Sequence, residues 1–406
     1  MSTFSNKLLL TILLLVICAN TSILLSTKNY TLLDNLKSFF TQYHKEESVQ
    51  YKLTLSTQDT RKLRSWELFD DSEKLNKARL EGEMCSGKKC TKVKVRSKGD
   101  LSRHWESKRK SYRFKFDDHS FMQADIVDFT LAKDRYFEIE YLAKSLGDKL
   151  GLMQLPYEMS LMSINNSHKT LYLKSLKYTK INMEKYLREY THIVRLKNLW
   201  LPNLKQANIG TFYYGFNENI YYFNKWREYE QLYTIEPERN IEDVTYQLSQ
   251  GLKCIRDACP QLQAHFHLES FAKWLAVISI FGSYHATLGD NLFFLYNKAQ
   301  RNFSPIVNDV LIRPIKSNFD IWLINMQRGN GFINSLFQIK AFEYLFKKKL
   351  KELMDLDILK LRNQILKKYS QFYEYSNTSP FLIKRGIEGR GHVLSNNLKK
   401  IEEYLQ

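Results

Sequence analysis

The sequence contains no internal repeat and no low-complexity tract, and it has only five cysteines in 406 residues. A hydrophobic content of 44% excludes a disordered tail, and a chain of this length can bury a large core in one elaborate domain or in two lobes. Acidic residues are scarce, with 43 against 61 basic ones, so the formal net charge is +18. This charge, with 14% aromatic residues, suits phosphate, nucleic acid or an anionic lipid surface, and charge alone does not choose among them.

The N-terminal segment has no charged residue between Lys7 and Lys28. Residues 8–18 are almost all Leu, Ile and Val, which is typical of a secretory signal or a short membrane anchor. No clear cleavage site follows, so a cleaved signal and a retained anchor both stay open, and Ile17 before Cys18 disfavours lipoprotein processing. We therefore expect an exported chain, secreted or membrane-anchored, with residues 1–27 as signal or anchor, 28–48 as linker or stalk, and a domain outside the cytoplasm.

The remaining four cysteines form two pairs with the same short spacing, Cys85 with Cys90 and Cys254 with Cys259. This spacing is unlike that of zinc ligands, and an exported chain would oxidise the thiols. Two local disulfides are the natural interpretation, although cross-pairing and four free thiols stay open. Their role is structural in each case.

Hydrophobic periodicity predicts an α+β fold with a strand-rich N-terminal half and a mainly helical C-terminal half. Alternating apolar side chains indicate strands over residues 49–55, 92–98 and 112–116. A polar turn predicts a hairpin between residues 292–296 and 303–307, and an aromatic-rich region predicts another over 212–223. Apolar residues at helical spacing indicate helices over residues 137–150, 184–189, 241–252, 271–281 and 337–369, of which 271–281 is expected to be buried on almost every side.

Basic residues gather on two of the predicted strands. The first strand carries Lys94, Arg96 and Lys98 on one face, and the second begins after Lys110 and carries Arg113 and Lys115. Two adjacent strands would present one cationic face, for which a polyphosphate is a suitable ligand, because Arg offers forked donors and Lys a point charge. The alternative is a solvated or membrane-facing basic surface.

Polar residues lie at both ends of the predicted hairpin in the second half. His285, Asp290 and Asn291 precede it, and Asp309 follows it, so the four residues are expected at the same end of the hairpin. Carboxylate and amide oxygens brought together in this way can hold a hard cation such as Mg²⁺. The alternative is that Asp and Asn serve here only as turn formers.

These segments together resemble the spore coat protein H (CotH) kinase family. The residues that carry the resemblance are Val95-Arg96-Ser97-Lys98-Gly99, the basic run 108–116, and Asp290-Asn291 with residues 303–309. The resemblance covers roughly residues 49–380 and implies an atypical, two-lobed, protein-kinase-like domain over residues 49–390, followed by a helical tail over 391–406. It also implies an exported kinase that transfers phosphate from ATP to Ser or Thr of a protein substrate with Mg²⁺ or Mn²⁺, with no nucleic acid expected as partner.

The resemblance also implies roles for single residues. Asp309 is similar to the metal-binding aspartate of the family, and Asn291 to the catalytic-loop asparagine that helps to hold the cation. Arg96 and Lys110 are similar to basic residues of the family near the nucleotide, and Lys98 and Arg113, on the same cationic face, are expected to bind the nucleotide with them. Glu138 or Glu140, on the helix predicted over 137–150, is expected to pair with one of the lysines, and Glu138 is expected at the nucleotide-binding site.

The sequence departs from the family pattern at two places. The catalytic aspartate expected five positions before Asn291 is replaced by Ala286, so that His285 or Asp290 would have to accept the proton. A lost general base typically costs a factor of ~10² to 10⁴ in rate. The glutamate expected near Leu176 is also absent. Two alternatives therefore stay open: a weak or inactive nucleotide-binding pseudokinase that acts as a surface interaction or adhesin module, and a basic membrane-surface protein unrelated to nucleotide.

Overall fold

The computed structural model describes residues 50–64, 79–98, 110–132, 136, 138–196, 233–236, 240–257, 259, 261–287, 291–370 and 380–406. The chain divides into two compact units, Met1–Ser48 and Val49–Gln406, and all described residues belong to the second. The predicted signal or anchor, the linker, the aromatic hairpin over 212–223 and Asp290 lie outside the described residues. Among the described helices, none combines the length and the apolarity needed to cross a membrane.

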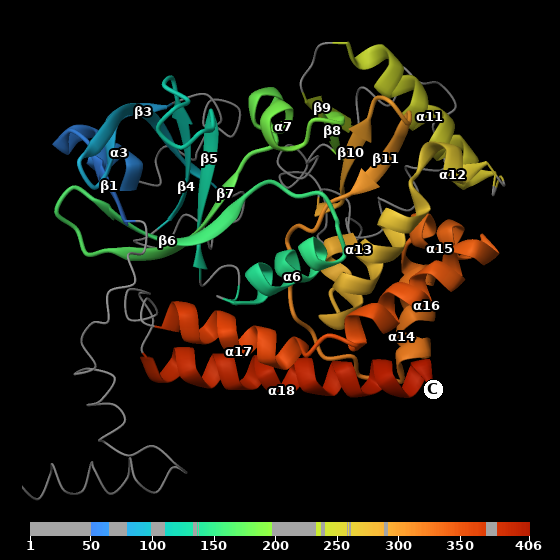
Figure 1. The fold of residues 1–406 in the computed structure, drawn as a ribbon. Helices are drawn as coiled ribbons and strands as arrows, with labels where there is room; N and C mark the ends of the chain where they lie inside the picture. The colour runs from blue at the N-terminus through green and yellow to red at the C-terminus, as the bar shows by residue number, and fades with distance from the viewer. Residues whose placement is uncertain are drawn as a thin grey trace, which may run out of the picture. The chain divides into compact units, whose positions relative to one another are not determined.

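Seven strands of the first half close into a barrel (Figure 1). Their order around the barrel is β1-β2-β3-β4-β5-β7-β6, and β1 closes it by pairing in parallel with β6. The interior is filled by alternating apolar residues such as Phe114 and Phe129, whose rings meet edge to face at 5.2 Å. The strands are β1 (Gln50–Thr54), β2 (Leu80–Ser86), β3 (Lys89–Lys98), β4 (Ser111–Phe116), β5 (Ile126–Leu131), β6 (Tyr157–Ile164) and β7 (Thr170–Leu176).

A second, four-stranded sheet has the order β11-β10-β8-β9. It contains β8 (Tyr190–Leu196), β9 (Tyr233–Glu236), β10 (Phe293–Asn297) and β11 (Asn302–Pro305). The predicted hairpin is confirmed as β10 and β11, which pair from Phe294 with Pro305 to Asn297 with Asn302. The three strands predicted in the first half are confirmed as β1, β3 and β4.

Helices dominate the C-terminal half, as the sequence predicts. The described helices are α3 (Thr57–Arg64), α6 (Glu138–Lys149), α7 (Lys180–Tyr186), α11 (Ile241–Arg256), α12 (Leu262–His265), α13 (Leu268–Ile280), α14 (Phe319–Gly329), α15 (Gly331–Phe337), α16 (Lys340–Met354), α17 (Ile358–Tyr369) and α18 (Pro380–Leu405), with a 3₁₀ turn, η4, at Tyr284–Thr287. The predicted burial of α13 is confirmed, because Phe271, Trp274 and most of its other residues belong to the core.

Two helix boundaries differ from the prediction, and a capping side chain explains each difference. The predicted helix over 337–369 is interrupted, because the Asp357 carboxylate accepts a hydrogen bond from the amide of Lys360 and so starts α17 as a separate helix. The helix predicted over 184–189 begins earlier, as α7, because the Thr179 hydroxyl accepts from the amide of Asn182.

The C-terminal residues belong to one continuous helix. The expected boundary between residues 390 and 391 falls inside α18, which runs from Pro380 to Leu405. Leu394, Asn397 and Ile401 on this helix are almost fully buried. The second half of α18 therefore packs as part of the helical core.

The four described cysteines form two local pairs. Cys85 and Cys90 face each other across the β2–β3 hairpin, and Cys254 at the end of α11 is bonded to Cys259. Glu83 lies beside the first pair, but both of its sulfurs are bonded to each other and offer no thiolate to a metal. These two local disulfides are compatible with an extracellular protein.

The first prediction concerns Glu138, which is 0% exposed and lies 2.7 Å from Arg362 and 2.9 Å from Arg390. Glu138→Gln removes the charge that these two arginines share, so we expect the free energy of unfolding in urea to fall by about 3–5 kcal/mol. Glu343→Gln is the control, because Glu343 forms an exposed ion pair with Lys347 and should change stability by less than about 1 kcal/mol. If both substitutions lowered the free energy of unfolding equally, the buried Glu138 charge would not have the stabilising role described here.

Candidate functional site

The pairing register of the barrel shows which side chains share its outer face. Residues paired across neighbouring strands project to the same side of a sheet. Asp128 on β5 pairs with Ser175 on β7, and Thr130 pairs with Leu173. Ser175 pairs in turn with Tyr157 on β6, and the Tyr157 ring meets that of Tyr141 on α6 edge to face at 5.0 Å. Asp128 and Thr130 therefore point to the side of the sheet that α6 covers.

Three of the predicted cationic residues lie on that same side. Arg96 on β3 pairs with Arg113 on β4, which pairs in turn with Asp128. The Arg113 guanidinium donates two hydrogen bonds to the Asp128 carboxylate, at 2.6 and 2.8 Å. The Lys98 amine lies 2.9 Å from the same carboxylate and donates to the Thr130 hydroxyl at 3.1 Å. The basic strands thus form a cationic row built around one buried carboxylate.

Asp128 was not identified from the sequence, although an aspartate inside the apolar strand Ile126–Leu131 is itself a signal, because aspartate is rare in strands. Burial opposes ionisation of this carboxyl group, but Arg113 and Lys98 outweigh burial and hold its pKa well below the usual range. Asp128 is therefore a stable anion that fixes both cationic side chains in place. The single negative charge of Asp128 is outnumbered by the three positive charges of Arg96, Lys98 and Arg113.

Lys110 and Glu138 are both almost fully buried. Lys110 is 1% exposed at the entry to β4, and burial lowers the pKa of its amine. Glu138 does not pair with a lysine of the basic strands, because Arg362 and Arg390 neutralise it in the helical core. The nucleotide-binding role of Glu138 stays a prediction, and in the structure its carboxylate pairs with these two arginines.

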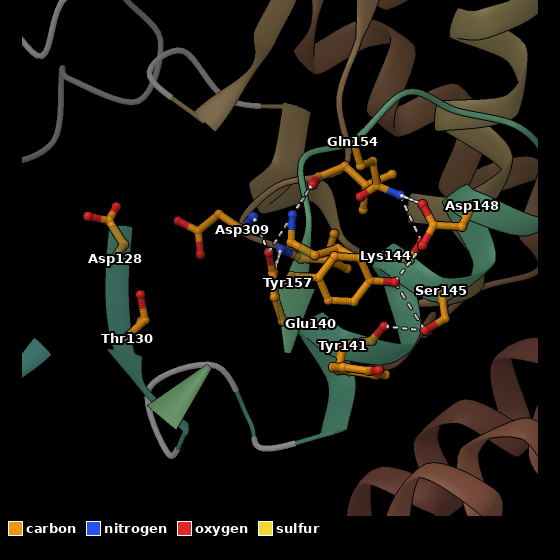
Figure 2. A network of polar contacts seen from close by, with 12 residues as sticks. Asp128, Thr130, Glu140, Tyr141, Lys144, Ser145, Asp148, Gln154, Tyr157 and Asp309 are labelled. Atoms are coloured by element: carbon orange, nitrogen blue, oxygen red, sulfur yellow. Dashed lines mark hydrogen bonds and ion pairs between the residues drawn. The ribbon is translucent and has the colours of Figure 1, made fainter. Parts of the chain in front are cut away.

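Glu140, the other candidate on α6, holds the chain segment that carries Asp309. Its two carboxylate oxygens accept hydrogen bonds from the backbone amides of Asp309 and Val310, at 3.2 and 2.8 Å (Figure 2). Lys144, one turn later on α6, donates to the carbonyl of Val307 at 2.9 Å and lies 3.9 Å from Glu140. Side chains of α6 therefore form hydrogen bonds with the backbone before and after Asp309.

Asp309 has a left-handed backbone, with a φ of 52°. This conformation is uncommon for a residue with a side chain and persists only where the surroundings enforce it, which often happens at functional sites. In Figure 2 the Asp309 carboxylate points away from Glu140, toward the side on which β5 carries Asp128 and Thr130. The amide of Leu311 donates to the Ser283 hydroxyl at 3.1 Å, which fixes the chain just beyond.

Three of the residues predicted around the hairpin come together. His285 Nε2 lies 3.4 Å from the Asp309 carboxylate, and the amide nitrogen of Asn291 lies 3.2 Å from the same imidazole nitrogen. The Asn291 nitrogen also donates to the His285 carbonyl at 3.4 Å, so its oxygen faces away from the histidine. A carboxylate and an amide oxygen in one place fit the preference of Mg²⁺ and Mn²⁺ for oxygen ligands.

A polar network, which sequence reasoning missed, ties α6 to β6 beside this site (Figure 2). The Tyr157 hydroxyl donates to Asp148 at 2.7 Å, and the Lys144 amine lies 5.6 Å from the centre of the Tyr157 ring. Burial raises the pKa of Tyr157, so the hydroxyl stays protonated and acts as a donor. Gln154 donates to Asp148 and to the carbonyl of Lys144. The network holds α6 against the barrel.

Comparison with known proteins adds little to this geometry. No protein-family model and no curated protein matches the sequence. Among solved structures, the chain is similar to the Helicobacter pylori proinflammatory kinase CtkA, with 10% sequence identity and a TM-score of 0.25, over 72% of this chain and 94% of that chain. This likeness is too weak to indicate a function, and the proposal below is based on the geometry of the site.

The second prediction uses the depressed pKa of Asp128. Because the folded pKa lies below the unfolded value of about 3.9, the stability that the carboxylate contributes is present above about pH 4 and is lost as the pH falls toward the folded pKa. In urea, the free energy of unfolding of Asp128→Asn should therefore lie well below that of the wild type at pH 7. The difference between the two proteins should be smaller at pH 3. Asp320→Asn, on the surface of α14, controls for net charge. An equal difference in free energy of unfolding at both pH values would show that the charge of Asp128 does not stabilise the fold.

Proposed function

We propose that the protein is a phosphotransferase that takes a nucleoside triphosphate and a divalent cation, and that its acceptor is a Ser or Thr hydroxyl of a protein. The observation that carries the proposal is the shared side of the barrel sheet. Lys98 and Arg113 lie on the face that α6 covers, and Glu140 of α6 holds Asp309 by its backbone. The sheet face thus carries the cations proposed to bind phosphate, and α6, which packs on that face, holds the carboxylate proposed to bind the metal.

The chemistry of phosphoryl transfer matches these residue types. The transferred group needs positioning and neutralisation of its negative charge more than it needs covalent catalysis. Arg113 offers a forked pair of donors and Lys98 a point charge, both oriented by Asp128. Asp309 and Asn291 would hold the cation, which neutralises phosphate charge when bound.

His285 is the candidate base among the described residues of this site. Its Nε2 atom lies 3.4 Å from Asp309 and within hydrogen-bond reach of Asn291, and its side chain is about one third exposed, at 32%. The contact with Asp309 orients the imidazole, as a carboxylate does in many acid–base sites. Asp290, the other candidate, lies outside the described residues.

A nucleotide-binding pseudokinase is the second candidate function, and one observation favours it. Ala286 is 1% exposed, so the position where the family resemblance expects the catalytic aspartate is buried in the η4 turn. A carboxylate at that position would be the usual base, and His285 beside it already contacts both Asp309 and Asn291. A site of this kind would bind nucleotide and metal with little or no transfer.

We propose that the domain works outside the cytoplasm. The apolar segment over residues 8–18 supports export, by cleaved signal or by retained anchor, and the two local disulfides are compatible with an oxidising compartment. Its substrate would then be an exported or surface protein.

The third prediction tests the metal site through Asp309→Asn, which keeps the shape of the side chain and removes its charge. We expect phosphate transfer from labelled ATP, with Mg²⁺ or Mn²⁺, to fall at least ~10²-fold, because a metal ligand that stabilises phosphate charge is lost. Asp320→Asn should transfer like the wild type. Full activity of Asp309→Asn would exclude the proposed metal role.

The fourth prediction separates an active kinase from a pseudokinase. If His285 is the base, His285→Ala should lower transfer by ~10² to 10⁴ while leaving the thermal stabilisation by Mg·ATP in place. Thermal stabilisation of the wild type without any transfer would instead establish the pseudokinase. No stabilisation and no transfer by the wild type would rule out both functions.

A further inference from the structure

The C-terminal helices α17 and α18 lie beside α6, far from Asp309 in the sequence. Arg362 of α17 and Arg390 of α18 both bind the Glu138 carboxylate at the start of α6. Arg362 also donates to the Ile387 carbonyl, which joins α17 to α18 (Figure 1). The Tyr141 and Tyr369 rings meet at 5.3 Å one turn further along α6. These contacts fix the first turn of α6 against the C-terminal helix pair.

The same α6 helix reaches Asp309 from its next residues. Glu140 and Lys144 bind the backbone at Val310, Asp309 and Val307. Glu138 and Glu140 are two positions apart on a helix that is buried on most of its surface, so a shift of the first turn moves the carboxylate that holds Asp309. The position of Asp309 is therefore linked to α18 through a single rigid helix.

A second route runs directly from α18 to the two segments that flank the site. The buried Asn397 side chain donates to the carbonyls of Ile280 and Arg313, at 3.2 and 2.9 Å, and accepts from the amide of Ile315 at 2.9 Å. Ile280 ends α13, just before the turn that carries His285, and Arg313 follows Asp309 by four residues. Asn397 thus fastens the His285 segment and the Asp309 segment to each other.

Gly282 shows how closely these two segments pass. It has a positive φ of 57°, and a Cβ at this position would collide with the carbonyl of Arg313. The amide of Arg313 also donates to the carbonyl of Phe281 at 2.8 Å. The Asn397 hydrogen bonds therefore stabilise a point where the chain after α13 and the chain after Asp309 pass in close contact.

We infer that α18 is a positioning element of the candidate site: Arg390 acts through Glu138 and Glu140 of α6, and Asn397 acts through the crossing of the His285 and Asp309 segments. The inference rests on the proposed function, because the geometry of Asp309 matters for catalysis only if this carboxylate holds the cation. None of these positioning residues touches a reacting group. Each sets where Asp309 and His285 stand relative to one another.

The test measures amide hydrogen exchange in the full chain, which needs neither ATP nor metal. Arg390→Gln keeps the Arg362–Glu138 pair and is therefore milder than a change of Glu138, and Asn397→Ala interrupts the second route. We expect exchange of the amides around Asp309 and Val310 to accelerate about tenfold in each variant, relative to peptides of the β2–β3 hairpin in the same sample. Glu140→Gln, which weakens the direct hydrogen bonds, sets the scale of the effect.

Two exposed positions on α18 supply matched controls. Asn396→Ala removes the neighbouring amide, and Glu403→Gln changes a surface charge, so neither should alter exchange near Asp309. Acceleration confined to α6, α17 and α18 in Arg390→Gln and Asn397→Ala would overturn the inference. Uniform acceleration throughout the protein would also overturn it, because it would show a loss of general stability without specific coupling.

A second measurement separates failure of this inference from failure of the proposed function. Mn²⁺ affinity, followed by electron paramagnetic resonance, should fall about fivefold or more in Arg390→Gln and Asn397→Ala and stay unchanged in the two controls. Unchanged Mn²⁺ affinity in these variants, with normal binding by the wild type, would show that α18 does not position the site. If the wild type does not bind Mn²⁺, the proposed function fails, and the exchange experiment still decides whether α18 is coupled to Asp309.

Discussion

The hydrogen bonds from the amides of Asp309 and Val310 to the Glu140 carboxylate are the contacts on which the site depends. A carboxylate with two amide donors is a strong, charge-assisted arrangement, and it holds Asp309 in a left-handed conformation that a free chain would seldom adopt. Because Glu140 belongs to α6, Asp309, the proposed metal ligand, is fixed to the helix that also packs on the barrel sheet.

Buried carboxylates play different structural parts on the barrel and in the helical half. On the barrel face, Asp128 neutralises part of the cationic row and gives Lys98 and Arg113 a defined position before any ligand arrives. In the helical half, two arginines neutralise Glu138, and these ion pairs join α6 to α17 and α18. Similar carboxylate–cation pairs thus orient the proposed phosphate-binding side chains in one case and join helices in the other.

Local sequence patterns predict the elements of this fold better than their assembly. Strands β1, β3 and β4, the β10–β11 hairpin and the buried helix α13 follow from periodicity, and His285, Asn291 and Asp309 follow from their places beside the hairpin. The closed barrel depends on the parallel pairing of β1 with β6, which no local pattern encodes. The pairing of Glu138 with Arg390 spans 252 residues, so local sequence patterns do not indicate this partner. The N-caps Thr179 and Asp357 set the starts of α7 and α17 at positions that hydrophobic spacing does not indicate.

We propose that the cationic row of the barrel and the cluster of His285, Asn291 and Asp309 bind one nucleotide together. This proposal can be tested by a crystal structure of the protein with Mg²⁺ and a non-hydrolysable ATP analogue. We expect the metal at Asp309 and Asn291, with the phosphates reaching the side chains of Lys98 and Arg113. A nucleotide bound elsewhere, or a metal with no ligand from Asp309, would contradict it.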